Sequence, residues 1–209
     1  MKPGFPGQEA IREFFDRLAD DWDQDQVVGE DRLRAIVDLA CLCPGDRVLD
    51  VGTGTGVLLA LLADRVRPHG RVVGVDLSPQ MLALARRKGV TWGLGDELEL
   101  LQADVHALPF PEGHFAAVLC YSAFPHFQRQ AAAVGEMARV LCPGGRLVIA
   151  HNESREAVNR RHREIGGAIG GHELPPAGEM RRLLASQRLG PVLLKDEADS
   201  YLAVAVRSC

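Results

Sequence analysis

The sequence has 209 residues, 25% of them charged, and a formal net charge of −4 at pH 7. This length suffices for one domain with a full hydrophobic core, and the acidic balance argues against nucleic acid as the main partner. Because no apolar stretch approaches the roughly 20 residues of a membrane span and the first eight residues lack the pattern of a signal peptide, we expect a cytoplasmic protein without a membrane span.

Two helices are expected before the first strand. Ile11, Phe14, Phe15 and Leu18 recur at helical spacing, which predicts an amphipathic helix over residues 8–23. This helix either packs on the domain or covers a ligand with its aromatic side chains. A second helix is expected over residues 31–42, with an acidic residue at its start as N-cap.

A glycine-rich loop follows the first predicted strand, residues 48–51, and precedes a helix over residues 57–66. Gly52, Gly54 and Gly56 allow a sharp turn and a close approach of a ligand to the backbone, and the acidic Asp50 stands just before them. The free N–H groups of the next helix favour an anionic or hydrogen-bond-accepting ligand group. Because dinucleotide-binding proteins use a similar loop, the loop alone does not identify the ligand.

Strands and helices then alternate along the chain, which predicts a parallel sheet covered on both faces. The expected strands are residues 71–76, 99–104, 115–121 and 146–150, and the expected helices are residues 78–89, 128–141, 154–165 and 178–189. Two last strands, residues 191–195 and 201–206, are too close in sequence for a crossover helix. They must therefore pair antiparallel.

The five cysteines are odd in number and scattered, which is typical of reduced thiols. Cys41 and Cys43 are separated by one residue, a spacing that can bind metal or support redox chemistry. We interpret this pair as part of the core.

Several segments taken together resemble the class I S-adenosylmethionine-dependent methyltransferases, in particular the type 11 small-molecule group related to the ubiquinone and menaquinone methyltransferases. They are residues 15–23, 48–56, 73–81, 103–110 and 139–147. The resemblance implies a Rossmann-like α/β fold: a three-layer α/β/α sandwich around a seven-stranded, mostly parallel sheet with an antiparallel last strand. It also implies S-adenosyl-L-methionine as cofactor and S-adenosyl-L-homocysteine as product. We expect one domain, in which residues 1–43 form a helical lid, residues 44–151 bind the cofactor, and residues 152–209 supply acceptor-side helices and the terminal hairpin.

Acidic residues end the second and third predicted strands, where an open α/β sheet binds its ligand. Asp76 is placed to accept hydrogen bonds from both ribose hydroxyls. The alternative is that Asp76 does no more than cap the helix that follows. Asp104, with the Val105 N–H, is expected at the adenine edge, the alternative being a solvated acid; Met81 packs on adenine or in the core. The expected cofactor-binding set is Phe15, Trp22, Asp50, Gly52, Thr53, Gly54, Gly56, Asp76, Leu77, Met81, Asp104, Val105 and Cys120.

Three histidines follow the fourth and fifth predicted strands, on the side expected for the methyl acceptor. His126, His151 and His162 are the candidate catalytic residues, because an imidazole can take the proton of a phenol or other weakly acidic acceptor. The same three could bind a divalent metal such as zinc, which we do not expect, or could be structural. His172 is a weaker candidate, in a loop that would close over the acceptor.

The expected function is methyl transfer from S-adenosyl-L-methionine to a small-molecule acceptor by in-line displacement. The alternatives are an NAD(P)-linked oxidoreductase on a Rossmann-like fold and a non-catalytic module that binds the same cofactor. Neither a basic stripe nor an Asn-Pro-Pro-Tyr-type segment follows the fourth predicted strand, which lowers the expectation of a nucleic-acid substrate. The acceptor, its reacting atom and the oligomeric state are not set by these patterns.

Overall fold

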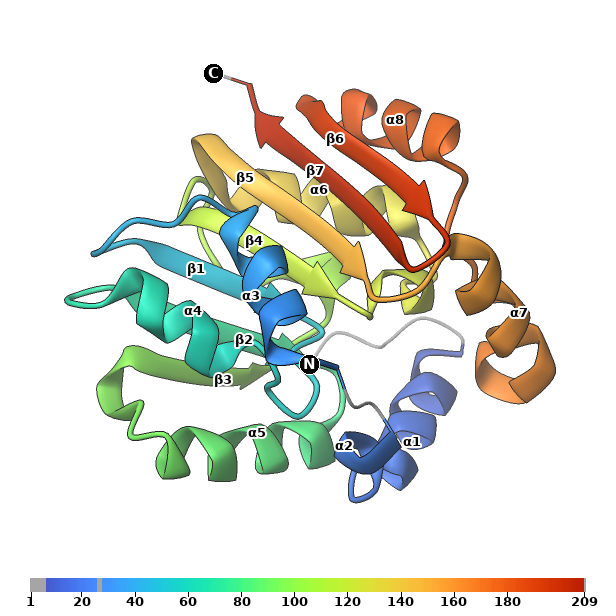
Figure 1. Ribbon diagram of the computed structural model, residues 1–209, viewed down its shortest axis with the longest axis horizontal. Helices are drawn as coiled ribbons and strands as arrows, with labels where there is room; N and C mark the ends of the chain where they lie inside the picture. Colours follow the sequence, from blue (N-terminus) through green and yellow to red (C-terminus); the bar gives the residue numbers. More distant parts are fainter. Residues whose placement is uncertain (1–6, 26–27, 209) are drawn as a thin grey trace.

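A seven-stranded sheet forms the centre of the computed structural model, which describes residues 7–25 and 28–208. The strand order is β3-β2-β1-β4-β5-β7-β6 (Figure 1). β7 pairs antiparallel with both β5 and β6, and the remaining neighbours pair parallel, so the predicted sheet and its antiparallel last strand are confirmed. The strands are β1 (Arg47–Val51), β2 (Arg71–Asp76), β3 (Leu98–Gln102), β4 (Phe115–Tyr121), β5 (Leu141–His151), β6 (Leu189–Glu197) and β7 (Ser200–Arg207).

Helices cover both faces of the sheet and complete the three predicted layers. α3 (Glu30–Asp38), α4 (Leu59–Val66) and α5 (Pro79–Thr91) bury apolar side chains in a core on one face. On the other face, α6 (Gln130–Val140) and α8 (Ala177–Ser186) enclose a second core around Phe115 and Met137. α1 (Gln8–Leu18), α2 (Trp22–Asp25) and α7 (Arg155–Ile165) lie beyond the carboxyl ends of the parallel strands (Figure 1).

Most element boundaries differ from the sequence-based prediction by a few residues; β3 ends at Gln102, so Asp104 lies beyond this strand and not at its end as expected. Three larger differences change the description of an element. The helix expected over residues 8–23 is divided into α1 and α2 by a turn, and α3 begins after Gly29, without the expected acidic cap. β5 begins at Leu141 and so includes the Pro143-Gly144-Gly145 segment that was expected to precede it. Its pairing with β4 jumps from Leu141 to Arg146, because this segment is accommodated as a bulge.

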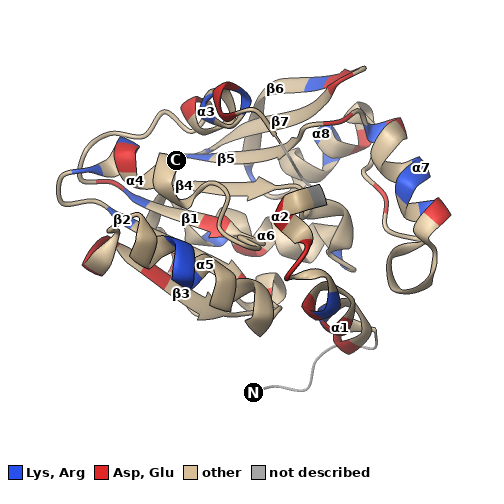
Figure 2. Cartoon of the chain, turned by 60° about the horizontal axis from the view of Figure 1, so that its bottom comes forward, with Lys and Arg blue, Asp and Glu red and all other residues tan. Residues whose placement is uncertain are grey.

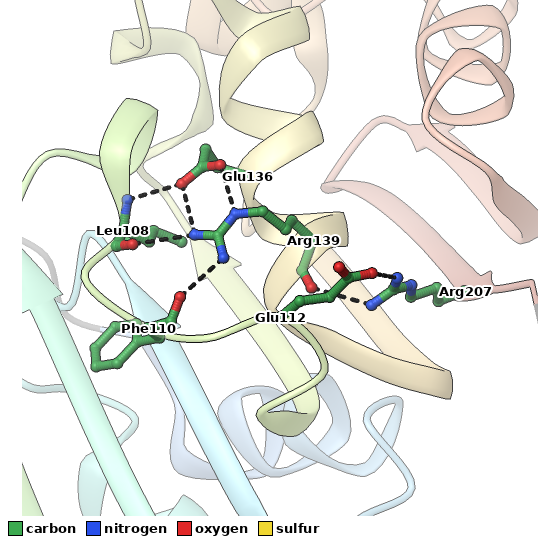
Figure 3. A network of polar contacts seen from close by, with 6 residues as sticks. All are labelled: Leu108, Phe110, Glu112, Glu136, Arg139 and Arg207. Atoms are coloured by element: carbon green, nitrogen blue, oxygen red, sulfur yellow. Dashed lines mark hydrogen bonds and ion pairs between the residues drawn. The ribbon is translucent and has the colours of Figure 1, made fainter.

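Two segments that carried the family resemblance contact each other directly in the fold. Arg139 of α6 donates to the carbonyl oxygens of Phe110 (2.8 Å) and Leu108 (3.0 Å), while Glu136 accepts from the Leu108 N–H (2.9 Å) (Figure 3). Glu136 and Arg139 also form an ion pair at 2.7 Å, which holds both side chains in place. α6 therefore fixes the backbone of the loop between β3 and β4.

The two closely spaced cysteines correct one prediction. Cys41 and Cys43 are exposed free thiols in the turn between α3 and β1, so their assignment to the core is wrong. Cys120 is buried and Cys142 is half-buried, both as free thiols, whereas Cys209 lies outside the described residues. Over residues 7–25 and 28–208, no helix has the length and apolar character needed to span a bilayer.

Candidate active site

A large cavity opens at the carboxyl ends of β1, β2 and β4, beneath α1 and α2. Its volume is about 1200 Å³ when the open solvent at its mouth is included. Its walls carry both apolar side chains and the polar groups of the strand ends. The lining residues used below are Gln8, Phe15, Trp22, Asp23, Gly52, Thr53, Gly54, Thr55, Asp76, Leu77, Met81, Asp104, Val105, His106, Tyr121, Ser122, Ala123, His126 and Phe127.

Two glycines of the loop after β1 contribute to the cavity in different ways. Gly52 has a φ of 71°, and a Cβ there would stand 2.4 Å from that of Ala123, so this position permits close packing of the loop after β4. Gly54 has a φ of 54°, but a Cβ there would meet nothing within 4 Å. Gly54 therefore leaves open a space that a ligand can fill.

Asp76, at the end of β2, presents a carboxylate that the backbone holds in a fixed orientation. One of its oxygens accepts from the Gly54 N–H and the other from the Ser78 N–H, both at 2.8 Å. Burial raises the pKa of Asp76, and these hydrogen bonds act in the opposite direction. Since each carboxylate oxygen can accept a further hydrogen bond, Asp76 fits a pair of neighbouring hydroxyl groups.

Asp104, just beyond β3, is held by His106 and by the start of α1. It accepts from the His106 N–H (3.0 Å) and the His106 Nδ1 (2.6 Å), and Gln8 donates to it as well. Burial would raise the pKa of Asp104, but these hydrogen bonds outweigh it and the pKa is lowered. An ionised Asp104 is suited to accept from an amino group of a ligand.

Asp50 lies behind the glycine loop and is only 2% exposed. It accepts from the Thr53 hydroxyl at 2.7 Å. Burial raises the pKa of Asp50 to about 7, opposed by this hydrogen bond and supported by the charge of Asp76. Asp50 does not line the cavity, so any effect on a ligand is transmitted through Thr53 or through its charge.

Charged contacts fasten α1 and α2 over the cavity, and charges of both signs lie on this segment (Figure 2). Asp16 of α1 accepts from the Ser78 hydroxyl at 2.5 Å. Asp23 of α2 accepts from the Thr55 hydroxyl at 2.6 Å and pairs with Lys88 of α5, also at 2.6 Å. The cover, as we call residues 8–25, is thus tied to the glycine loop and to both ends of α5.

A group of histidines lies beside the cavity, where a 3₁₀ turn (Phe124–His126) follows β4. Ser122 makes this turn with a φ of 55°, a strained conformation for a residue with a side chain. His126 lines the cavity and its ring contacts the ring of Phe15, the centroids being 4.9 Å apart. Its Nδ1 lies 3.2 Å from the Nδ1 of His172, and the ring of His162 is 4.8 Å from its own.

Burial lowers the pKa of His126 well below its usual value, and the charges of His162, His172, His151 and Arg161 add to this effect. The imidazole is therefore neutral at physiological pH and carries one lone pair. His151 is buried as well, its pKa lowered to about 3, and its Nε2 has no hydrogen-bond partner among the described residues. Neither His151 nor His162 lines the cavity.

The structure brings most of the predicted cofactor-binding residues to one cavity and leaves three of them outside it. These three are Asp50, Gly56 and Cys120. A Cβ at Gly56 would collide with α4 and α5, and Cys120 is buried in the core around Phe115 and Met137. His106, Thr55 and Ser122 line the cavity without having been predicted. His106 could have been found from its position two residues after Asp104, whereas nothing in the sequence indicates Ser122.

No group of three or more metal-ligating side chains is arranged to hold an ion within the part of the chain that the structure describes. The histidines that meet at the cavity contact one another through Nδ1 atoms and a backbone carbonyl. A metal bound by His126, His151 and His162 therefore has no preformed site here.

Residues 49–149 match a family model described as a methyltransferase domain. The demethylmenaquinone methyltransferase of Thermus thermophilus is 49% identical over 116 residues, which is 56% of this chain and 51% of that protein. The ubiquinone/menaquinone biosynthesis C-methyltransferase UbiE of Pseudomonas putida is 33% identical over 176 residues, or 83% of this chain and 63% of the relative. The chain thus spans between half and two thirds of the length of these relatives.

Solved structures show the same fold at lower sequence identity. A SAM-dependent methyltransferase from Aquifex aeolicus superimposes with a TM-score of 0.69 at 21% identity, covering 93% of this chain and 97% of that one. The [4+2]-cyclase SpnF superimposes with a TM-score of 0.79 at 18% identity, covering 97% of each chain. Proteins of this fold thus include one named for a cyclisation, so the fold does not define the reaction.

Proposed function

This chain belongs to the methyltransferase family through residues 49–149, and on that premise we propose that it transfers a methyl group from S-adenosyl-L-methionine to a small-molecule acceptor. The observation that carries the proposal is the Asp76 carboxylate, fixed by the Gly54 and Ser78 N–H groups at the wall of the cavity. It fits the ribose of the methyl donor. The open space above Gly54 fits a ligand that lies across the glycine loop.

The other groups of the donor find residues of suitable chemistry along the same wall. Asp104 would accept from the adenine amino group, and Leu77 and Met81 would pack against the ring. Thr53 and the charge of Asp50 would favour the ammonium of the methionine portion. When bound, S-adenosyl-L-methionine supplies a methyl carbon activated by its sulfonium. The chain's residues bind it, exclude water and align the acceptor, and alignment alone can contribute about 7–11 kcal/mol.

The names of the relatives from Thermus thermophilus and Pseudomonas putida refer to quinones, and the acceptor that we propose for this chain is the reduced form of such a ring, a hydroquinone. Phe15, Trp22 and Phe127 give this cavity aromatic walls that suit a flat ring. Tyr121 also lines it, and its buried hydroxyl lies near the side chain of Ser122, which lines the cavity too. This hydroxyl is available to an oxygen of the acceptor.

His126 would take the phenolic proton of such an acceptor. Ionising a phenol of pKa near 10 at pH 7 requires about 4 kcal/mol, so a neutral base at the cavity wall accelerates the reaction. His126 lines the cavity in the neutral form that this role requires. His151 and His162 would act only through other residues, because neither lines the cavity.

The test has a binding stage and a turnover stage. Calorimetry should show that S-adenosyl-L-homocysteine binds and that NAD does not; preferential binding of NAD would overturn the proposal in favour of an oxidoreductase. Methyl transfer is then measured with S-adenosyl-L-methionine and a reduced 1,4-naphthoquinone. Binding of S-adenosyl-L-homocysteine without methylation of any of a panel of phenols, thiols and amines would instead indicate a non-catalytic module.

A further inference from the structure

A second histidine stands directly behind His126, in the loop that joins α7 to α8. The Nδ1 of His172 is 3.2 Å from the Nδ1 of His126, and the two rings are inclined at 66° with centroids 5.4 Å apart. Nothing in the proposed function uses His172. Its ring is half-buried and does not line the cavity.

The loop that carries His172 is fastened from three sides, so its ring is held in register with His126. The buried Asn159 of α7 donates to the Leu174 carbonyl (3.1 Å) and accepts from the Leu174 N–H (2.8 Å). Tyr201 of β7 donates to the Pro175 carbonyl at 2.9 Å. His162 contacts residue 172 itself: the Nδ1 of His162 lies 2.6 Å from the His172 carbonyl oxygen.

The contact between two Nδ1 atoms restricts the protons of both rings. Two lone pairs would repel at this distance, and two N–H groups would collide, so one Nδ1 carries the proton and the other accepts it. If His126 donates, its Nε2 is a lone pair and His172 carries its proton on Nε2. If His172 donates, the Nε2 of His126 bears a hydrogen and cannot take a proton from an acceptor.

We propose that His172 is a positioning residue that holds His126 as the Nδ1–H tautomer and so leaves the Nε2 lone pair for the methyl acceptor. This inference rests on the proposed function, in which His126 is the base. In the proton transfer, the acceptor O–H bond breaks and its proton forms a bond to Nε2 of His126. The resulting imidazolium keeps its Nδ1–H donated to the lone pair of His172, while the acceptor keeps the electron pair that attacks the methyl group.

The groups around the pair favour this use of a neutral His172. The titratable or charged groups whose effects reach His126 are His162, His172, His151 and Arg161, and each of them disfavours a positive charge on it. His172 has this effect only when it is charged; in the neutral form its Nδ1 lone pair lies at hydrogen-bond distance from Nδ1 of His126 and can stabilise the imidazolium as it forms. The ring of Phe15 contacts His126 as well, with the centroids 4.9 Å apart.

Two substitutions separate this role from a role in folding. His172→Asn places an amide oxygen near the position of Nδ1 and can still accept from His126, whereas His172→Leu cannot. Glu173→Gln is the matched control on the same loop, since it weakens the 2.6 Å ion pair with Arg163 and leaves the imidazole pair untouched. Calorimetry with S-adenosyl-L-homocysteine should give the wild-type Kd for all three variants.

Nitrogen-15 NMR of histidine-labelled protein reports the tautomer without any turnover. We expect the Nδ1–H form of His126 in the wild type, His172→Asn and Glu173→Gln, and a different tautomer ratio in His172→Leu. With a reduced 1,4-naphthoquinone as acceptor, kcat should fall at least 10-fold in His172→Leu and should largely recover in His172→Asn. In the wild type, kcat should rise with pH, and His172→Leu should shift this pH profile.

A wild-type tautomer and kcat in His172→Leu would overturn the inference, as would His172→Asn being as slow as His172→Leu. A wild-type His126 found with its proton on Nε2 would also overturn it. The proposed function fails by other results, namely absent binding of S-adenosyl-L-homocysteine or absent methyl transfer by the wild type. The two failures are therefore distinguishable.

Discussion

Replacing Asp76 by alanine tests how the cavity would hold the methyl donor. The substitution removes a carboxylate whose two oxygens accept from Gly54 and Ser78 at 2.8 Å. In the proposed complex it also removes the acceptor for both ribose hydroxyls. Each hydrogen bond to a charged group contributes about 1.5–3 kcal/mol, so the loss of two weakens binding by at least about 3 kcal/mol, or roughly 100-fold in Kd.

The same substitution acts on the fold in two opposing ways. It leaves two backbone N–H groups without their acceptor, at a cost of about 1–3 kcal/mol each where water does not replace it. It also removes a buried charge whose raised pKa shows that burial disfavours it. The midpoint of thermal unfolding without ligand should therefore change much less than the affinity.

Isothermal titration calorimetry with S-adenosyl-L-homocysteine measures the effect. Asp64→Ala is the matched control, because Asp64 is an acidic residue of α4 whose side chain is 53% exposed and pairs only at 3.6 Å with Arg67. The control should keep the wild-type Kd. An Asp76→Ala variant that folds and binds within a factor of three of wild type would refute the assignment of the ribose to this carboxylate.

Five further outcomes are expected. Because the pKa of Asp50 is raised to about 7, its charge is present above that pH, so affinity for S-adenosyl-L-homocysteine should rise between pH 6 and 8 in calorimetry; Asp50→Asn should abolish the slope. For the same reason the unfolding free energy of the free protein contains an Asp50 contribution that decreases as pH rises from about 4 to 7, measurable by urea titration. Gly54→Ala should destabilise the fold by only about 1–2 kcal/mol, the cost of its positive φ, and so lower the melting temperature slightly. The same substitution should weaken S-adenosyl-L-homocysteine binding, and an unchanged affinity would mean that the ligand does not use the space above Gly54. Asn159→Ala should destabilise the fold by about 2–4 kcal/mol, because it leaves the N–H and carbonyl of Leu174 unpaired; a loss under 1 kcal/mol by urea titration would contradict this. Lys88→Met should speed dissociation of S-adenosyl-L-homocysteine in stopped-flow measurements, since it removes the cation that holds the cover, and an unchanged rate would show that the cover opens elsewhere.

The sheet and its strand ends were predictable because they follow from local patterns. Apolar runs ending in Asp76 gave the position of β2 and of its carboxylate, and the short link before Tyr201 required the antiparallel hairpin. The Ser78 cap of α5 was equally local: its hydroxyl accepts from the Met81 N–H at 3.1 Å. Such features depend on neighbours a few residues away, which the sequence displays directly.

Features that depend on distant contacts were not predictable in the same way. The helix expected over residues 8–23 is interrupted by a turn at residues 19–21, and Asp23 of the second helix then bonds to Thr55, 32 residues further along the chain. His151 was expected just after the fifth strand; it is instead the last residue of β5 and is buried beside Tyr201, since the direction of a strand-end side chain depends on register. The contact of His126 with His172 spans 46 residues, and only the folded chain places the second ring behind the first.

The contacts that fasten the cover have a consequence for the timing of a catalytic cycle. Asp16 binds beside the expected ribose site, Asp23 binds at the glycine loop, and Gln8 binds at the expected adenine site. A spent donor would leave only after these ties separate. The ion pair of Asp23 with Lys88 is partly open to solvent, so dissolved salt screens it, whereas the buried reacting groups are shielded. Ionic strength would then control how fast the product departs while leaving the chemical step unchanged.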